Sequence, residues 1–340
     1  MRALLERSDV DLDAVDEDDR TPLCVAAQNG HEGVVRILVE QNGVNPNLAD
    51  NCGRTPVFWA AGNGQEGVLR ILLGRSDVNP NIADTFFCLP PLSWAARNGR
   101  EGVVRILLER NDVNPERACR HGLTPLSQAA LWGHEGVVRI LLERSDVNPN
   151  ATDETGRTPL ALAAWWGREG VVRIFLERND VDPERTCQIG LTPLSQAAFS
   201  GHEGVVRILL ERSDVNPNTA DKTGRTPLSW AAEHRHKGVI RILLERNDVN
   251  LDTTDRYGQT PASWAAKYGL TELQSFYEAR QILLSDMQQT SNQQTPAPPS
   301  CPNHLNPFQK DCQVLMLNGK SNLAYLPLSI MQKKIDEAQS

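Results

Sequence analysis

The sequence predicts an all-α repeat solenoid of about eight helix-turn-helix units. Two observations predict this fold class. Prolines recur 34 residues apart, with a single step of 35, at positions 22, 56, 91, 125, 159, 193, 227 and 261. Around each proline, apolar, small and charged residues follow in the same order. A fixed period in this range is typical of stacked repeats, in which one unit cannot bury its apolar face alone.

The repeat that begins at Asp153 shows how one unit is built. Thr158 suits an N-cap, because its hydroxyl can accept a hydrogen bond from an unpaired helix amide. Pro159 suits the first helical position, where the missing N–H costs nothing. This first helix ends before Gly167, which tolerates the left-handed conformation that stops a helix. A second helix is predicted from Glu169 to Glu177, with mostly apolar residues.

Two further features recur in every unit. An Ala-Ala pair in each first helix allows neighbouring helices to approach closely, at 26–27, 60–61, 95–96, 129–130, 163–164, 197–198, 231–232 and 265–266. After most second helices, an Asn/Asp-Val-Asn-Pro segment and a following glycine predict an extended finger that turns back into the next unit.

These motifs resemble those of ankyrin-repeat proteins, and the sequence of the repeats is similar to that of fungal-type ankyrin arrays. Asp221 to Leu228 matches Asp-x-x-Gly-x-Thr-Pro-Leu, Ala129 to His134 matches Ala-Ala-x-x-Gly-His, and Val137 to Leu142 matches Val-Val-x-x-Leu-Leu. The period also fits tetratricopeptide repeats, but Thr-Pro-Leu and the extended finger favour ankyrin. The resemblance implies stacked helix pairs with β-hairpin fingers at right angles to them, which together form a concave groove.

The sequence departs from the family pattern at several positions. The usual histidine after Thr-Pro-Leu is replaced throughout, by Cys24, Phe58, Ser93, Ser127, Ala161, Ser195, Ser229 and Ser263. Asp19 and Arg235 stand at glycine positions, and Pro90 replaces a cap threonine. The third repeat carries one inserted residue near Phe86-Phe87-Cys88, which predicts a distorted finger.

The array is predicted to cover residues 16–285. Residues 1–15 match the end of a second helix and are interpreted as a truncated half repeat, which suggests a truncated start or a lost N-terminal domain. Residues 286–307 are rich in Gln, Pro, Ser, Thr and Asn, which is typical of a flexible linker. Residues 308–340 form a short tail in which we expect a hairpin followed by a helix.

Composition excludes several classes of protein. The chain has 340 residues, 43 of them acidic and 35 basic, with a net charge of −8. An acidic balance argues against direct nucleic-acid binding, which needs a basic stripe. No apolar stretch is long enough for a membrane helix, and the N-terminus is no secretory signal. Seven scattered cysteines indicate reduced thiols, so we expect a cytoplasmic and/or nuclear protein. The chain is also expected to be a monomer.

No catalytic, cofactor or metal site is predicted, so the chain is expected not to be an enzyme. His-Glu-Gly-Val-Val at 31, 134 and 202 lacks the second histidine of a zinc helix. Gly319-Lys320-Ser321 resembles the end of a phosphate-binding loop, but the required first glycine is Val314. Cys301, His304 and Cys312 form an incomplete set of zinc ligands.

Aromatic residues give the strongest functional signal. Trp59, Trp94, Trp230 and Trp264 share one register beside Ala-Ala, where partial burial is expected. One helical turn later stand the predicted anchors for a protein partner: Trp132, Trp165, Trp166, Phe199 and Tyr268. By the resemblance these positions face the groove, and tryptophan is enriched among interface hot spots. The predicted polar contacts around them come from finger residues, namely Arg120, His121, Glu154, Gln188, Ile189 and Lys222.

Arginines recur along the second helices, and most have a glutamate four residues later, as Arg139 has Glu143. We expect such pairs within a helix to stabilise its exposed face only slightly.

The sequence therefore predicts a non-enzymatic scaffold or regulator that binds a protein partner through the concave groove. One setting is a transcription coregulator that binds a transcription factor. The alternative is the ligand-sensing ankyrin end of a larger NACHT-type receptor, of which this chain would be a truncated product.

Overall fold

The computed structural model describes residues 11–41, 43–246, 248–269 and 275. Within these residues there are fifteen α-helices in sequential order and no strand. The chain divides into two compact units, residues 1–188 and residues 189–340, and each is described by itself. The predicted all-helical repeat architecture is confirmed.

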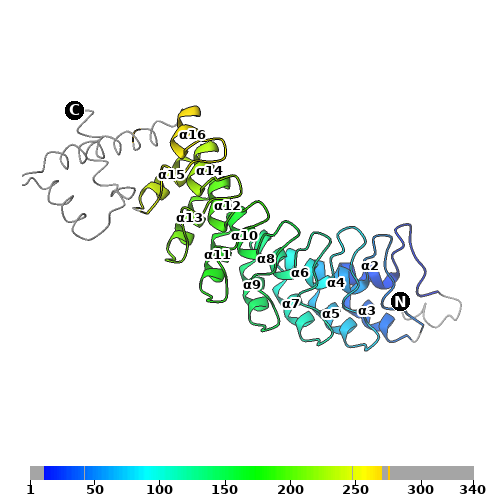
Figure 1. Ribbon diagram of the computed structural model, residues 1–340. Coiled ribbons are helices and arrows are strands. Elements are labelled where there is room, and N and C mark those ends of the chain that lie inside the picture. Colours follow the sequence, from blue (N-terminus) through cyan, green and yellow to red (C-terminus); the bar gives the residue numbers. More distant parts are fainter. Residues whose placement is uncertain (1–10, 42, 247, 270–274, 276–340) are drawn as a thin grey trace, which may run out of the picture. The chain divides into compact units, whose positions relative to one another are not determined.

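The first unit holds five helix pairs. Its first helices are α2 (Pro22–Asn29), α4 (Pro56–Asn63), α6 (Pro91–Arg97), α8 (Pro125–Trp132) and α10 (Pro159–Trp165). Its second helices are α3 (Glu32–Val39), α5 (Glu66–Leu73), α7 (Glu101–Leu108), α9 (Glu135–Leu142) and α11 (Glu169–Leu176). First helices pack on one another in chain order, as do second helices, so each set forms a row (Figure 1).

The second unit repeats this arrangement. Its first helices are α12 (Pro193–Ser200), α14 (Pro227–Glu233) and α16 (Pro261–Lys267), and its second helices are α13 (Glu203–Leu210) and α15 (Lys237–Leu244). A partner for α16, the linker at 286–307, the tail at 308–340 and most of the half repeat at 1–15 fall outside the described residues. The predicted count of about eight repeats is therefore not confirmed.

The first helices begin as the sequence predicts. In seven of them a threonine hydroxyl accepts a hydrogen bond from the backbone N–H three residues later, as Thr158 does from Ala161 at 3.1 Å. A proline follows each cap. The exception is α6, where Pro90 supplies no side-chain cap. Such a cap contributes about 1 kcal/mol to helix stability.

Residues in the left-handed conformation, with positive φ, follow the first helices and also occur in the fingers. Gly167 has a φ of 69°, which is the conformation expected for the predicted helix stop. Asp19 and Arg235 have a φ of 60° at their glycine-like positions, and Cys88 has a φ of 53° in the altered third finger. Non-glycine residues rarely adopt this conformation. The extra residue of the third repeat is therefore absorbed in its finger rather than in α6.

The core of each unit is a thin layer between its two rows of helices. Alanines of the first helices, such as Ala129 and Ala130, are fully buried and allow close packing. Valine, isoleucine and leucine of the second helices, such as Val138 and Leu141, fill the other side. Each helix is only seven or eight residues long, so its stability depends on packing against neighbouring repeats.

The fingers are turns, not strands. Most tips begin with an aspartate whose carboxylate accepts two backbone hydrogen bonds, as Asp50 does from Cys52 and Arg54, both at 2.9 Å. Neighbouring tips within a unit are joined by a single backbone bond, such as Glu154 N–H to the His121 carbonyl at 3.2 Å. One bond per step does not make a strand ladder, so the expectation of β-hairpin fingers is not confirmed.

Arginine–aspartate pairs brace the ends of the second helices. Arg110 donates to Asp112 at 2.6 and 2.8 Å and to the Leu73 carbonyl of the preceding repeat at 3.2 Å. The hydrogen bond from Arg110 holds the pKa of Asp112 below its ordinary value. Equivalent pairs with aspartate two residues later are made by Arg75, Arg144, Arg178, Arg212 and Arg246.

The expected pairing of helix arginines within one helix is wrong. Arg139 forms its ion pair with Glu177 of the next repeat at 3.7 Å, while Glu143 pairs with Arg105 of the preceding repeat at 3.8 Å. The glutamates lie just past the helix ends, where the stagger between stacked repeats brings them beside the neighbouring arginine. These pairs are exposed and contribute little to stability.

Candidate functional site

Three of the four tryptophans beside Ala-Ala are tied to a finger. The indole Nε1 of Trp59 donates to Asp50 at 3.0 Å, that of Trp230 to Asp221 at 3.1 Å, and that of Trp264 to Asp255 at 3.0 Å. Each aspartate stands nine residues before its tryptophan. This bond locks the finger onto the first helix. Sequence reasoning predicted burial and missed the bond, although the nine-residue spacing could have revealed it.

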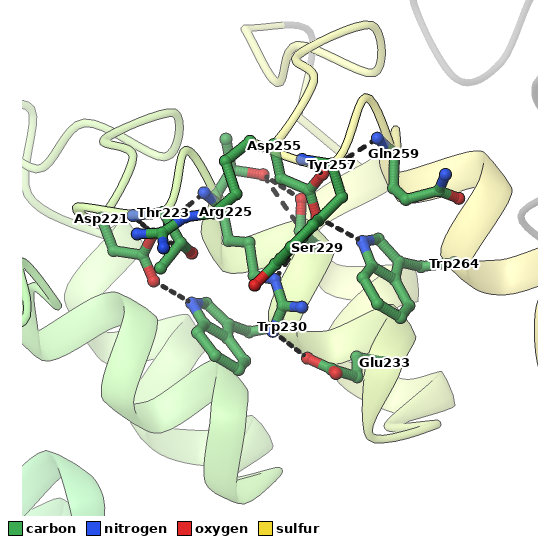
Figure 2. Close-up of polar contacts among 12 residues, drawn as sticks. Asp221, Thr223, Arg225, Ser229, Trp230, Glu233, Asp255, Tyr257, Gln259 and Trp264 are labelled. Atoms are coloured by element: carbon green, nitrogen blue, oxygen red, sulfur yellow. Dashed lines mark hydrogen bonds and ion pairs between the residues drawn. The ribbon is translucent and has the colours of Figure 1, made fainter.

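In the second unit an arginine lies between two of these indoles (Figure 2). The Arg225 guanidinium carbon is 4.7 Å from the Trp230 ring centroid and 4.6 Å from that of Trp264. Its nitrogens reach Glu233 at 2.6 Å and Asp255 at 3.4 Å. Each ring face attracts the cation, and the carboxylates satisfy its donors. The Trp–Arg–Trp stack is therefore complete within this unit.

Hydrogen bonds outweigh burial in setting the charge of Asp255. Burial favours the neutral carboxyl and opposes a low pKa. The N–H groups of Gln259 and Tyr257, together with the Trp264 indole and Arg225, donate to the carboxylate and hold its pKa below the ordinary value. The carboxylate thus fixes the finger turn and the tryptophan together.

The third repeat breaks the Trp–Asp pattern. Asp84 accepts instead from the N–H groups of Phe87 at 3.2 Å and Leu89 at 2.7 Å, because its finger is one residue longer. Trp94 stacks on Phe58, with centroids 5.6 Å apart and planes 15° apart. Its Nε1 lies directly over Gly62, where an added Cβ would come within 1.9 Å. The inserted residue therefore frees this indole from its aspartate.

Trp94 also forms one wall around Arg97, the last residue of α6. The Arg97 guanidinium carbon lies 5.6 Å from the Trp94 ring centroid and 4.9 Å from that of Trp132. This is the first unit's counterpart of the Arg225 stack. Sequence reasoning named Trp132 but not Arg97, because helical spacing does not show which side chains of neighbouring repeats meet.

The predicted anchors of the first unit stand at the ends of α8 and α10. Trp132 is 42% exposed and Trp166 is 51% exposed, while Trp165 is half-buried. Trp166 is the residue that caps the C-terminus of α10. Trp132 and Trp166 thus present large apolar surfaces to solvent, as expected of a contact surface.

The predicted anchors of the second unit are more involved in local packing. Phe199 is half-buried, and its ring centroid lies 5.2 Å from Trp230 and 4.1 Å from His234. Tyr268 is half-buried and stacks on Trp264 with centroids 6.2 Å apart. Both side chains therefore have a structural role in addition to any role in binding.

The predicted finger residues are all exposed: Arg120, His121, Glu154 and Gln188 in the first unit, and Ile189 and Lys222 in the second. Some of them also join neighbouring tips. Gln188 Nε2 donates to the Glu154 carbonyl at 2.6 Å, and His121 lies 3.9 Å from the Glu154 carboxylate. Ile189 is 60% exposed, which is unusual for an apolar residue of this size.

Among the exposed apolar residues that the sequence analysis missed, two stand side by side in the chain. Phe86 is 61% exposed and Phe87 is 48% exposed, at the tip of the altered third finger. The Phe87 carbonyl accepts a hydrogen bond from the Arg120 N–H of the next tip at 2.9 Å, so an apolar tip adjoins a basic one. The inserted residue noted in the sequence was the available signal for this feature.

The chain matches the family model of ankyrin repeats over residues 1–84, 77–153, 145–221 and 213–295. The chain belongs to the ankyrin-repeat family. This family match and the helix pairs agree on the repeat unit. No curated protein matches the sequence significantly.

Ankyrin repeats are generally protein–protein interaction modules, and the family fold is typically non-enzymatic. Within the described part of this ankyrin-repeat chain, no group of three or more His, Cys, Asp or Glu side chains is placed to hold a metal ion. None of its described helices has the length and apolarity that a membrane span requires.

Proposed function

We propose that this ankyrin array binds a protein partner without catalysing a reaction, through the surface formed by its first helices and fingertips. The observation that carries the proposal is the exposure of Trp132 and Trp166 at 42% and 51%. The cap of α10 is made by the Trp166 backbone N–H and not by its indole, and α8 is capped by Gly133 rather than by Trp132. Exposed tryptophans lower solubility, and contact with a partner would remove them from water.

The fingertips supply the polar part of the proposed surface. In the first unit these are Arg120, His121, Glu154 and Gln188, and Phe86 and Phe87 add apolar area. In the second unit Ile189, Lys222, Phe199 and Tyr268 supply the corresponding residues. Trp165 is half-buried, so it offers the proposed surface a smaller exposed area than Trp166.

The test is quantitative affinity capture with the full chain. Trp166→Ala and Trp132→Ala should each weaken capture of the partner roughly 30-fold or more, as expected for a hot spot of about 2 kcal/mol. Arg139→Gln on the second helix α9 is the matched control, because it changes an exposed residue away from the proposed surface and should leave capture unchanged.

Far-UV circular dichroism must stay unchanged in both tryptophan variants. Capture that is equally strong with both variants would reject the proposed surface.

For the cellular setting, we propose a transcription coregulator that acts as a monomer through a bound transcription factor. The net charge of −8 supports recognition of a protein rather than of DNA. Nuclear enrichment of the tagged chain, lost together with capture in Trp166→Ala, tests this setting. Light scattering of the purified chain tests the monomeric state.

A further inference from the structure

Arg97 is held between two indoles but has no carboxylate beside it. Its guanidinium lies 5.6 Å from the Trp94 centroid and 4.9 Å from the Trp132 centroid. The Arg97 backbone carbonyl accepts a hydrogen bond from the His134 ring at 2.9 Å. Its side chain forms no hydrogen bond or ion pair with any described residue. A guanidinium carries five N–H donors, so this one has donors to offer.

The second unit shows what completes such a stack. Arg225 lies between Trp230 and Trp264, 4.7 and 4.6 Å from their ring centroids, and there Glu233 accepts from the guanidinium at 2.6 Å. Glu233 is the seventh residue of α14, and Arg97 is the seventh residue of α6. In the Arg225 stack, the seventh helix position therefore holds the carboxylate that pairs with the arginine. In the Arg97 stack, the same position holds the arginine itself.

The surroundings of Arg97 favour an acidic ligand. The tips that span residues 51–53, 85–88 and 120–122 expose apolar, neutral and basic side chains and no carboxylate. Asp50 and Asp84 at their bases are only 7% and 5% exposed, and both are engaged by backbone N–H groups. A carboxylate arriving from outside would meet Arg120 on these tips, whereas His121 already lies 3.9 Å from the exposed Glu154 carboxylate of the next tip.

We propose that Arg97, between Trp94 and Trp132, receives the carboxylate of an aspartate or glutamate in an acidic segment of the partner protein. The proposal rests on the proposed function and specifies the chemistry of the partner. A planar guanidinium binds a carboxylate through two parallel hydrogen bonds, and the flanking indoles hold the plane in place. The exposed part of Trp132 and the phenylalanines of the third fingertip then take apolar residues next to that acid.

A peptide-display selection on the full chain tests this site. Wild type and a matched control, Arg105→Gln, should both enrich peptides with Asp or Glu next to an apolar residue. Arg105 lies on α7 of the same repeat and forms an exposed pair with Glu143 at 3.8 Å, so the control removes the same charge from another face. Arg97→Gln should lose this enrichment.

The affinities of one selected peptide and of its neutral twin, in which the acid is changed by Glu→Gln or Asp→Asn, then measure the interaction between Arg97 and the peptide carboxylate. Arg97→Gln should weaken the acidic peptide about tenfold, and the twin should bind wild type about tenfold more weakly. The twin should bind Arg97→Gln with no further loss, because both changes remove the same pair. Arg97→Lys keeps the charge but not the planar fork, so it should restore only part of the affinity.

Three results would overturn the inference. Peptides selected without a preference for acids, or peptides bound equally by Arg97→Gln and wild type, reject the carboxylate site. If those peptides are still lost on Trp166→Ala, the proposed binding surface stands without it. A wild-type chain that retains no peptide rejects both the site and the peptide-binding surface. Unchanged circular dichroism of Arg97→Gln shows that the variant is folded.

Discussion

Replacing Pro90 with threonine should stabilise the third repeat, because proline provides neither a side-chain cap for helix α6 nor a partner for the Ser93 hydroxyl. Helix α6 begins without a side-chain cap. The Ser93 hydroxyl is fully buried and has no hydrogen-bond partner. In the next repeat a single threonine serves both purposes: Thr124 accepts from the Ser127 N–H at 3.2 Å, and its hydroxyl lies 3.1 Å from the Ser127 hydroxyl.

The backbone is already suited to the substitution. Pro90 has φ −72° and ψ 161°, against −74° and 167° for Thr124. A helix cap contributes about 1 kcal/mol, and pairing a buried hydroxyl contributes about 1 kcal/mol more. Losing the rigidity of proline in the unfolded chain costs up to about 1 kcal/mol. Pro90→Thr should therefore stabilise α6 by about 1 kcal/mol.

Hydrogen exchange read segment by segment is the appropriate assay, because repeat arrays open locally. Amides of α6 should exchange roughly fivefold more slowly in Pro90→Thr, which corresponds to about 1 kcal/mol. Two alanine variants serve as controls. Ser93→Ala should be neutral or slightly stabilising, whereas Ser127→Ala should cost about 1 kcal/mol. The reasoning is refuted if Pro90→Thr exchanges as fast as wild type, or if both alanine variants cost the same.

Three further predictions concern the second unit and the contact between the second and third repeats. Arg225→Met keeps an apolar stem between the indoles but removes the hydrogen-bond donors, so hydrogen exchange should show α16 destabilised by about 2–3 kcal/mol. The control Arg207→Met removes an arginine from an exposed ion pair, and its stability should stay within about 0.5 kcal/mol of wild type. Equal effects of the two substitutions would contradict this prediction. Gly62→Ala places a Cβ within 1.9 Å of the Trp94 indole, so thermal unfolding should show a loss of stability of about 1–3 kcal/mol, with altered near-UV circular dichroism. Gly33→Ala is the control, because its Cβ meets open space, and it should be neutral or stabilising. The folded pKa of Asp255 lies below its ordinary 3.8, so its contribution to stability is present above pH 3.8 and is lost as the pH falls through the folded pKa. In urea unfolding, Asp255→Asn should therefore lose less free energy of unfolding than wild type as the pH is lowered through this range. An equally steep loss in both proteins would argue against this prediction.

The repeat unit could be predicted from sequence because its signals are local. A threonine, a proline and a glycine a few residues apart determine where a short helix begins and ends, and Thr158, Pro159 and Gly167 behave as predicted. The predicted strands of the fingers were not found, since a turn held by an aspartate carboxylate satisfies its own backbone N–H groups without a ladder.

The candidate site was predictable only in part. Exposed Trp132 and Trp166 followed from their place at the ends of the first helices. The pairing of Arg139 with Glu177, rather than with Glu143, did not follow, because it depends on the stagger between repeats. Phe199 was predicted as an anchor, but its contacts with neighbouring rings could not be read from helical spacing.

The sequence by itself determined the repeat period and the helix boundaries. Caps and stops act through the backbone of the same few residues, so they need no knowledge of the rest of the chain. Only the tertiary structure decided that Arg225 would be neutralised between its tryptophans while Arg97 would keep its donors. That difference depends on which side chains meet across stacked repeats, and spacing along one helix does not show this.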